Sequence, residues 1–239
     1  MKLKFLPLIA LAVANVCAHA DTVTRWAYDD TPTTTKFTES ANGGRFSTVG
    51  SITTSFATGV ASAPYAATQA LNTAGYAAQG AGSLSQGVEF DIDTSGYTNL
   101  VLSFNQRNSS TASAWTELQY TVNGTDWLVA TDLKMSVTDA SFVSVSYDFS
   151  SISDANNNAS FGVRMLSMFA PGTSAYVASG TTGTTTVNYS PNGTIRYDNV
   201  LLAGTAITDT SPVPEPHTYT LMLGGLMAFG LVARRRRAN

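Results

Sequence analysis

Alternation of apolar and polar residues in short segments most limits what this 239-residue chain can fold into. Apolar side chains recur at every second position, which is the period of a strand with one buried face. No segment between residues 21 and 204 keeps a helical period, although the Ala-rich residues 64–80 could hold one short helix. We therefore predict an all-β fold, an antiparallel β-sandwich of jelly-roll type. The apolar positions are Leu100, Leu102 and Phe104; Leu118, Tyr120 and Val122; Val143, Val145, Tyr147 and Phe149; and Phe161, Val163 and Met165.

Turn signals separate these segments. Asn123-Gly124 is a strong hairpin signal, so we expect one strand to end at Val122 and the next to start near Thr125. Residues 171–193 carry no charge and are rich in Gly and Thr, and we expect an irregular hairpin or a surface excursion there. The segment TIRYDNVLLAG that follows is predicted to be the closing strand.

The N-terminus has the layout of a secretory signal peptide. Two lysines precede a short apolar stretch, and the small residues Ala18 and Ala20 flank His19. We expect export through the Sec translocon and cleavage by signal peptidase after Ala20. The alternative, a lipoprotein signal with Cys17 acylated, is disfavoured because Asn15 and Val16 are not the small residues that such a signal needs.

Missing residue types exclude several kinds of chemistry. Cys17 is the only cysteine, and the two histidines, His19 and His217, also lie in the terminal segments. Residues 21–204 therefore offer no Ser-His-Asp or Cys-His nucleophile system and no zinc site built from His or Cys. The same region has seven basic and fourteen acidic residues, a formal net charge of −7, which argues against nucleic-acid binding.

Three carboxylates alternate along one predicted strand. Glu89, Asp91 and Asp93 would project from one face, about 7 Å between neighbours. They could be solvent-facing residues of an amphipathic strand, a calcium or sugar site, or a catalytic pair for glycoside hydrolysis. The spacing is similar to the Glu-x-Asp-x-Glu strand of one family of β-sandwich glucanases, but Asp93 stands where that pattern has a second Glu.

A second acidic candidate is Asp198, followed by Asn199. Their oxygen atoms suit a structural Ca²⁺. Alternatively, Asp198 accepts hydrogen bonds from backbone N–H groups or pairs with Arg196. The calcium hypothesis thus rests on Asp91, Asp93 and Asp198, and no other cofactor is indicated.

The three tryptophans allow two interpretations. Trp26, Trp115 and Trp127 could form a platform on which sugar rings stack. Alternatively, they belong to the hydrophobic core, where aromatic residues of a sandwich are usually found.

The C-terminus combines a proline cluster, an uncharged apolar run and a block of arginines. Prolines at 212, 214 and 216 prevent a helix from starting earlier, and residues 219–233 carry no charge. We predict a single membrane-spanning helix over about 217–233 in the inner membrane. By the positive-inside rule, the arginines stay in the cytoplasm as a stop-transfer block. They are Arg234, Arg235, Arg236 and Arg237.

This tail resembles the PEP-CTERM sorting signal of Gram-negative bacteria. The resemblance implies that exosortase, a membrane-embedded cysteine transpeptidase, processes the tail, and that the protein is linked to exopolysaccharide and biofilm production. The sorting motif would be Val213, Pro214, Glu215 and Pro216. The middle of the chain also resembles the jelly-roll ectodomains of other such proteins, in YTNLVLSFNQR, YTVNGTDW and IRYDNVLLAG.

These observations predict four segments and leave three functions open. The segments are a signal peptide (1–20), a β-sandwich ectodomain (21–204), a linker (205–211) and the sorting signal (212–239). The first function is a non-catalytic protein of the cell surface or extracellular matrix. The second is a carbohydrate-binding module with a calcium site, partnered by polysaccharide. The third is a carboxylate glycosidase.

Overall fold

The computed structural model describes residues 20–28, 39–40, 42–60, 69–136, 141–181 and 185–208. Residues 1–19 of the predicted signal peptide and the sorting tail lie outside the described residues. No described helix has the length and hydropathy needed to cross a membrane. One 3-10 turn, Ser153–Ala155, accompanies the strands. The strands are β1 (Asp21–Trp26), β2 (Glu39–Ser40), β3 (Gly44–Val49), β4 (Thr53–Thr58), β5 (Gln69–Ala74), β6 (Gly87–Ile92), β7 (Tyr97–Asn108), β8 (Trp115–Thr121), β9 (Leu128–Lys134), β10 (Val143–Asp148), β11 (Phe161–Ser167) and β12 (Ile195–Ala206).

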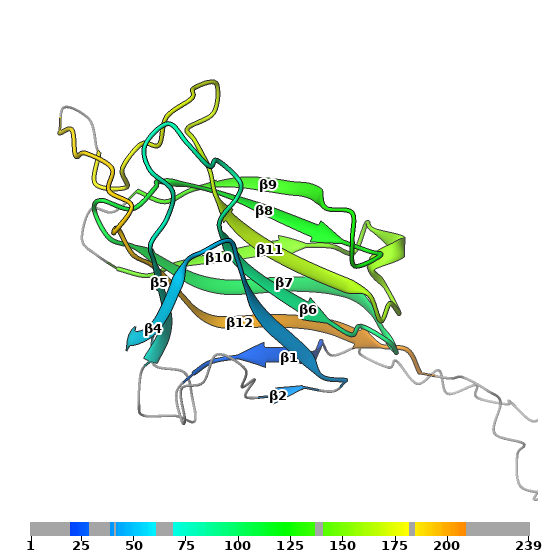
Figure 1. Ribbon diagram of the computed structural model, residues 1–239. Helices are drawn as coiled ribbons and strands as arrows, with labels where there is room; N and C mark the ends of the chain where they lie inside the picture. The colour runs from blue at the N-terminus through cyan, green and yellow to red at the C-terminus, as the bar shows by residue number, and fades with distance from the viewer. Residues whose placement is uncertain are drawn as a thin grey trace, which may run out of the picture. The chain divides into compact units, whose positions relative to one another are not determined.

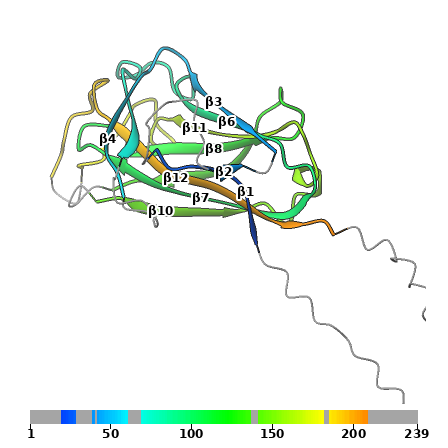
Figure 2. The same cartoon turned by 90° about the horizontal axis from the view of Figure 1, so that it is seen from below.

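The strands form two antiparallel sheets, which Figure 2 shows as two layers. The seven-stranded sheet has the order β10-β7-β12-β1-β2, and β5 adds to β12 with β4 beyond it. The five-stranded sheet has the order β3-β6-β11-β8-β9. The predicted all-β sandwich is confirmed at this level, while the jelly-roll type stays a prediction.

Strand β12 lies in the interior of the seven-stranded sheet and changes one of its partners halfway along (Figure 1). Ile195–Tyr197 pair with β5, and the residues from 200 to 204 pair with β1. On its other side β12 stays with β7, with a register shift between Asp198 and Leu201. The change of partner and this β-bulge coincide at residues 198–199, so the backbone is locally irregular there.

The predicted alternation places the core between the two sheets. Leu100, Leu102 and Phe104 of β7 are buried, as are Phe161, Val163 and Met165 of β11. The segment at β10 is less regular: Phe149 is fully buried, whereas Val143 is 44% exposed at the edge of the sheet. The alternation of apolar and polar residues therefore predicted the buried face of the interior strands correctly, but it overstated the burial of an edge strand.

The predicted hairpin at Asn123-Gly124 exists, but its loop is longer than expected. Strand β8 ends at Thr121 and β9 begins at Leu128, and the two strands pair antiparallel. The Asn123 side-chain oxygen accepts hydrogen bonds from the backbone N–H groups of Thr125, at 3.0 Å, and Asp126, at 2.8 Å. These bonds hold the chain in a local turn, so β9 begins further along the chain than predicted.

In the Ala-rich segment, where the sequence allowed one short helix, residues 69–74 form β5 instead. This strand lies between β12 and β4, and Ala70 and Leu71 are fully buried. Tertiary pairing therefore overrides the helical preference of alanine.

The charge-free segment from Pro171 is an irregular excursion in its described parts, as expected. Its Ala178 forms an isolated bridge with Ser113. Tyr176 stacks on Tyr189, with ring centroids 4.4 Å apart, and Tyr176 is buried. Aromatic packing thus fixes a segment that has no regular secondary structure of its own.

Candidate functional site

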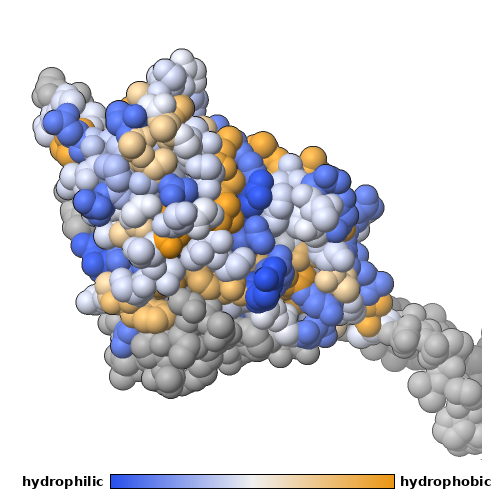
Figure 3. Space-filling view, in the orientation of Figure 1, coloured by the Kyte–Doolittle hydropathy of each residue, from blue (hydrophilic) through white to orange (hydrophobic). Residues whose placement is uncertain are grey.

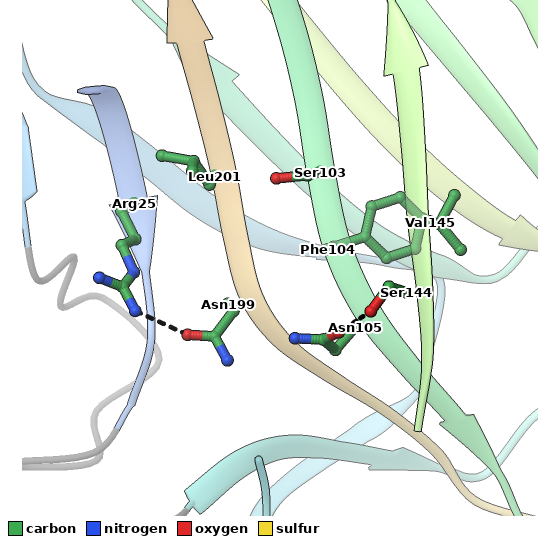
Figure 4. Close-up of a pocket in the computed structure, with 8 residues that line it drawn as sticks. All are labelled: Arg25, Ser103, Phe104, Asn105, Ser144, Val145, Asn199 and Leu201. Carbon is green, nitrogen blue, oxygen red and sulfur yellow. Dashed lines mark hydrogen bonds between the residues drawn. The ribbon is translucent and has the colours of Figure 1, made fainter. Parts of the chain in front are cut away.

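A groove of about 420 Å³ lies on the outer face of the seven-stranded sheet, across β10, β7, β12 and β1 (Figure 4). Four neighbouring strands contribute to it, so distant parts of the sequence meet there. Its lining residues are Arg25, Ser103, Phe104, Asn105, Ser144, Val145, Asn199 and Leu201.

Strand alternation and the β-bulge position these side chains. Ser103 and Asn105 point outward because the residues on either side of them in β7 point into the core. Asn199 lies at the bulge of β12 with φ of 48°, a left-handed conformation that few residues other than glycine adopt. The bulge directs its side chain toward Arg25, and the Arg25 guanidinium donates a 2.8 Å hydrogen bond to Asn199 Oδ1 (Figure 4).

A second polar contact holds the other side of the groove. The Ser144 hydroxyl of β10 donates a 2.8 Å hydrogen bond to Asn105 Oδ1 of β7. The lining thus offers amide and hydroxyl groups and one arginine beside the apolar Phe104, Val145 and Leu201, and no carboxylate is among the lining residues. Such a surface can exchange hydrogen bonds with a polar ligand, but its side chains provide no acid/base pair.

The structure places Asp198 beside this groove, but buries it. Its side chain is 0% exposed, and its carboxylate oxygens accept hydrogen bonds from the backbone N–H groups of Val60, at 2.7 Å, and Asn199, at 2.8 Å. The close approach needs a glycine at position 59, since an added Cβ would lie 2.4 Å from Asp198 Oδ2. The backbone-capping interpretation of Asp198 is therefore confirmed.

Arg196, the alternative partner of Asp198, makes other contacts. Its Nε donates to Asn72 Oδ1 at 3.2 Å, and its Nη1 donates to the carbonyl oxygen of Thr58 at 3.1 Å. Arg196 therefore holds β12 to the β4–β5 pair.

The three alternating carboxylates share one face only in part. Glu89 and Asp91 point outward from β6 in the five-stranded sheet, and Arg45 binds Asp91 with contacts of 2.6 and 2.9 Å. Asp93 lies beyond the strand and accepts a 2.9 Å hydrogen bond from the backbone N–H of Ser95. Because Asp198 is in the other sheet, the three metal candidates do not form one site. Within the described ranges no three acidic, His or Cys side chains gather closely enough to hold a metal ion.

Glu89 belongs to a network on the outer face of the five-stranded sheet. Burial and the nearby carboxylate of Asp91 raise the pKa of Glu89, and Arg164 opposes this rise. Arg164 Nε donates a 2.6 Å hydrogen bond to Gln119 Oε1, and Gln119 in turn bonds to Glu117. Burial lowers the pKa of Arg164, while Glu89 and Glu117 act in the opposite direction. The two carboxylates thus favour the charged form of Arg164, although burial has the larger effect on its pKa.

The three tryptophans divide between core and surface. Trp26 is fully buried and packs on Phe90, with ring centroids 4.8 Å apart. Trp127 is partly exposed and lies against the Arg164 guanidinium, 4.2 Å from ring centroid to carbon. Trp115, also partly exposed, lies 5.6 Å from the Lys134 ammonium. The core interpretation is confirmed for Trp26, and the two surface tryptophans contact cations.

Sequence reasoning missed most of the groove. Of its lining residues, the sequence singled out Asn199 alone as a functional candidate, and it named Phe104 and Val145 only as apolar strand positions. Arg25, Asn105 and Ser144 are outward-facing positions of three strands, and only the pairing of these strands brings them together. The polar positions of alternating segments were the available signal, but alternation does not tell which strands are neighbours.

Family comparison identifies the C-terminal segment. Residues 212–237 match the model described as the PEP-CTERM protein-sorting motif. The chain thus carries this sorting motif, as the resemblance of its tail indicated. No curated protein matches the sequence.

Several solved structures are similar to this chain at low identity. The CBM22-1–GH10 modules of Clostridium thermocellum endo-1,4-beta-D-xylanase 10B match with 13% identity and a TM-score of 0.40, over 70% of this chain and 27% of that one. The CBM22-1–CBM22-2 tandem domain of Paenibacillus barcinonensis Xyn10C matches with 11% identity and a TM-score of 0.45, over 80% and 48%. The xylan-binding module CBM15 matches with 16% identity and a TM-score of 0.39, over 70% and 94%. This chain spans less than half of the first two structures, and at these scores none of the likenesses bears on its function.

Proposed function

We propose that this protein is an exported, non-catalytic component of the cell surface or extracellular matrix of a Gram-negative bacterium. The match of residues 212–237 to the PEP-CTERM protein-sorting motif carries this proposal. The organisation that we propose is a signal peptide (1–20), a β-sandwich ectodomain (21–204), a linker (205–211) and the sorting signal (212–239). The first two residues of the predicted linker still belong to β12, where they pair with β7, so the ectodomain extends to Ala206. A link to exopolysaccharide or biofilm production belongs to the same proposal.

Each terminal segment has a role in this scheme. The Sec translocon exports the chain, and signal peptidase cleaves after Ala20. The helix at about 217–233 then holds the protein in the inner membrane, with the four arginines from Arg234 on the cytoplasmic side. Exosortase recognises Pro214, Glu215 and Pro216 and processes the tail, which releases the ectodomain or transfers it to the surface.

Replacement of the motif glutamate tests this scheme. Glu215→Ala should leave unprocessed protein in the inner membrane of the producing cell, detected by fractionation and intact-mass measurement. Asp209→Ala, which removes a carboxylate six positions earlier in the linker, is the matched control and should be processed normally. Normal processing of the Glu215 variant would contradict the proposal.

A second function, saccharide binding, is supported by the groove on the seven-stranded sheet. Its size and its amide and hydroxyl lining suit a sugar chain, whose hydroxyl groups donate and accept hydrogen bonds. We expect the full-length protein to be retarded in gels that contain the exopolysaccharide of its producer. Asn105→Leu should weaken this retardation, because it removes the Oδ1 atom that faces Ser144 and adds apolar bulk.

The calcium hypothesis for Asp91, Asp93 and Asp198 remains a separate proposal. Loss of a structural Ca²⁺ would lower the melting temperature of the full-length protein in EDTA. An unchanged melting temperature would contradict it.

A further inference from the structure

Two arginines on neighbouring interior strands of the seven-stranded sheet are directly opposite each other. Arg107 of β7 and Arg196 of β12 are paired residues in the antiparallel register, and both are partly exposed on its outer face. Like charges directly opposite each other on neighbouring strands are destabilising. Such a pair therefore needs a compensating contact.

No described carboxylate compensates this pair directly. The single ion pair among the described residues is Arg45 with Asp91, in the other sheet. The nearest acidic residue in register is Asp198, opposite Asn105, and its buried carboxylate accepts two backbone N–H groups. The contacts of Arg196 are to the neutral oxygens of Asn72 and Thr58.

Arg107 has unused donor capacity. Its Nε is buried and has no hydrogen-bond partner among the described residues. Burial and the neighbouring Arg107 both lower the pKa of Arg196, but a guanidinium stays charged at physiological pH. The two positive charges consequently persist side by side and cannot be relieved by loss of a proton.

The arginine pair continues the groove. Arg107 follows Asn105, a lining residue, by two positions on the same face of β7. Arg25 lies on the far side of the groove, in a region where β12 pairs with β1. The Arg25 guanidinium donates to Asn199 Oδ1, whereas Arg107 and Arg196 are two positive charges directly opposite each other in register.

We propose that the ligand of this groove is an anionic polysaccharide, with a sugar carboxylate held between Arg107 and Arg196 and neighbouring sugar units lying along Asn105 and Asn199. Paired guanidinium groups match the geometry of a carboxylate and bind it through charge-assisted hydrogen bonds. The formal net charge of −7 opposes the approach of an acidic polymer in general, so we confine the proposed contact to this one local patch of positive charge. This proposal rests on the proposed saccharide binding.

Binding of defined polymers tests the proposal. Polygalacturonate supplies sugar carboxylates, dextran supplies neutral sugars, and dextran sulfate supplies sulfates. We expect the full-length protein to bind polygalacturonate more tightly than the other two, with an affinity that falls as salt rises. Arg107→Gln/Arg196→Gln should raise the Kd for polygalacturonate about tenfold or more, since charge-assisted hydrogen bonds are lost.

A matched variant separates this patch from general charge effects. Arg45→Gln/Lys134→Gln removes the same number of positive charges from the five-stranded sheet, and its Kd should stay within about twofold of that of the parent. Equal melting temperatures of the parent and the Arg107/Arg196 variant would show that the loss is local. Equal weakening by the two variants, or binding of dextran sulfate at least as tight, would overturn the proposal.

The same measurements separate the anionic ligand from saccharide binding in general. If the producer's exopolysaccharide binds and polygalacturonate does not, the anionic assignment fails and saccharide binding stands. If no polysaccharide is bound, saccharide binding fails as well, and the sorting proposal is judged separately by processing of the Glu215 variant.

Discussion

The arginine side chains on the outer faces of the two sheets have different electrostatic surroundings. On the five-stranded sheet, Arg45 pairs with Asp91, and Arg164 lies in the field of Glu89 and Glu117. On the seven-stranded sheet, Arg107 and Arg196 face each other, and the nearby Asp198 is buried against backbone N–H groups. A face whose charges are balanced internally can serve stability alone, whereas an uncompensated pair beside a groove suits a charged ligand.

Exposed apolar side chains occur on both sheets. In the view of Figure 3, apolar residues form separate patches between hydrophilic ones. Exposed apolar side chains do occur on edge strand β9, where Leu128 is 49% and Val129 is 60% exposed. On the seven-stranded sheet, Val143 of edge strand β10 is 44% exposed as well.

The largest expected effect on stability comes from Asp198, and it tests whether this buried acid of the seven-stranded sheet has a structural role. Asp198→Ala should lower the free energy of unfolding by about 3 kcal/mol, because it leaves buried backbone N–H groups unsatisfied. Chemical denaturation of the parent and the variant measures this. Asp132→Ala, at an exposed acid on the other sheet, is the control and should change stability by less than about 0.5 kcal/mol. Similar losses in both variants would contradict the distinction.

A smaller effect is expected where an aromatic ring covers a cation on the five-stranded sheet. Trp127→Ala should cost about 1 kcal/mol, since it removes the ring that lies 4.2 Å from the Arg164 guanidinium. Trp115→Ala removes a longer contact, 5.6 Å to Lys134, and should cost less. Denaturation midpoints rank the two variants, and the reverse order would show that packing outweighs the cation contact.

The strained residue of the groove gives a comparison between two substitutions. Both Asn199→Ala and Asn199→Gly remove the hydrogen bond with Arg25, but only glycine adopts φ of 48° without strain. Asn199→Ala should therefore be less stable than Asn199→Gly by about 1 kcal/mol. Thermal melting of both variants checks the sign, and equal stability would indicate that the bulge relaxes.

The smallest effect concerns the pH dependence of the balanced face. The pKa of Glu89 is raised in the folded protein, so the folded state favours the protonated side chain over the carboxylate. The contribution of Glu89 to stability is therefore fully present below the unfolded-state pKa, near 4.5, and is lost as pH rises through the folded-state pKa. Glu89→Gln should consequently be more stable than the parent at pH 7 by a few tenths of a kcal/mol, after solvent screening. The difference should vanish toward pH 4. Urea denaturation at both pH values tests this, and a parent that is more stable at pH 7 would reverse the sign.

The sequence predicted the strands better than their arrangement. Leu100, Leu102 and Phe104 could be assigned to a buried face from their period alone, since alternation is a local property. In the Ala-rich segment, where the sequence allowed one short helix, residues 69–74 form β5 because contacts with β12 and β4 decide the conformation. Similarly, Asp198 was identified as a candidate from its type, but its burial under Val60 depends on residues far away in the chain.

The candidate site was the least predictable part. Arg107 and Arg196 are 89 positions apart, and neither lies in a recognisable motif. Their opposition follows from the register of β7 and β12, which a single sequence does not reveal. The sorting motif of the tail, in contrast, consists of contiguous residues, so their order and spacing alone suffice to recognise it.

The place of β12 in the chain bears on how the domain is completed. It is the last described strand, yet it lies inside the seven-stranded sheet and joins β7, β1 and β5. Until residues 195–206 are present, those three strands lack a common neighbour, and the domain cannot close by pairing of adjacent segments alone. A chain that crosses a membrane from its N-terminus would therefore stay open until nearly all of the domain has emerged. Final closure would then coincide with arrival of the sorting signal at the membrane.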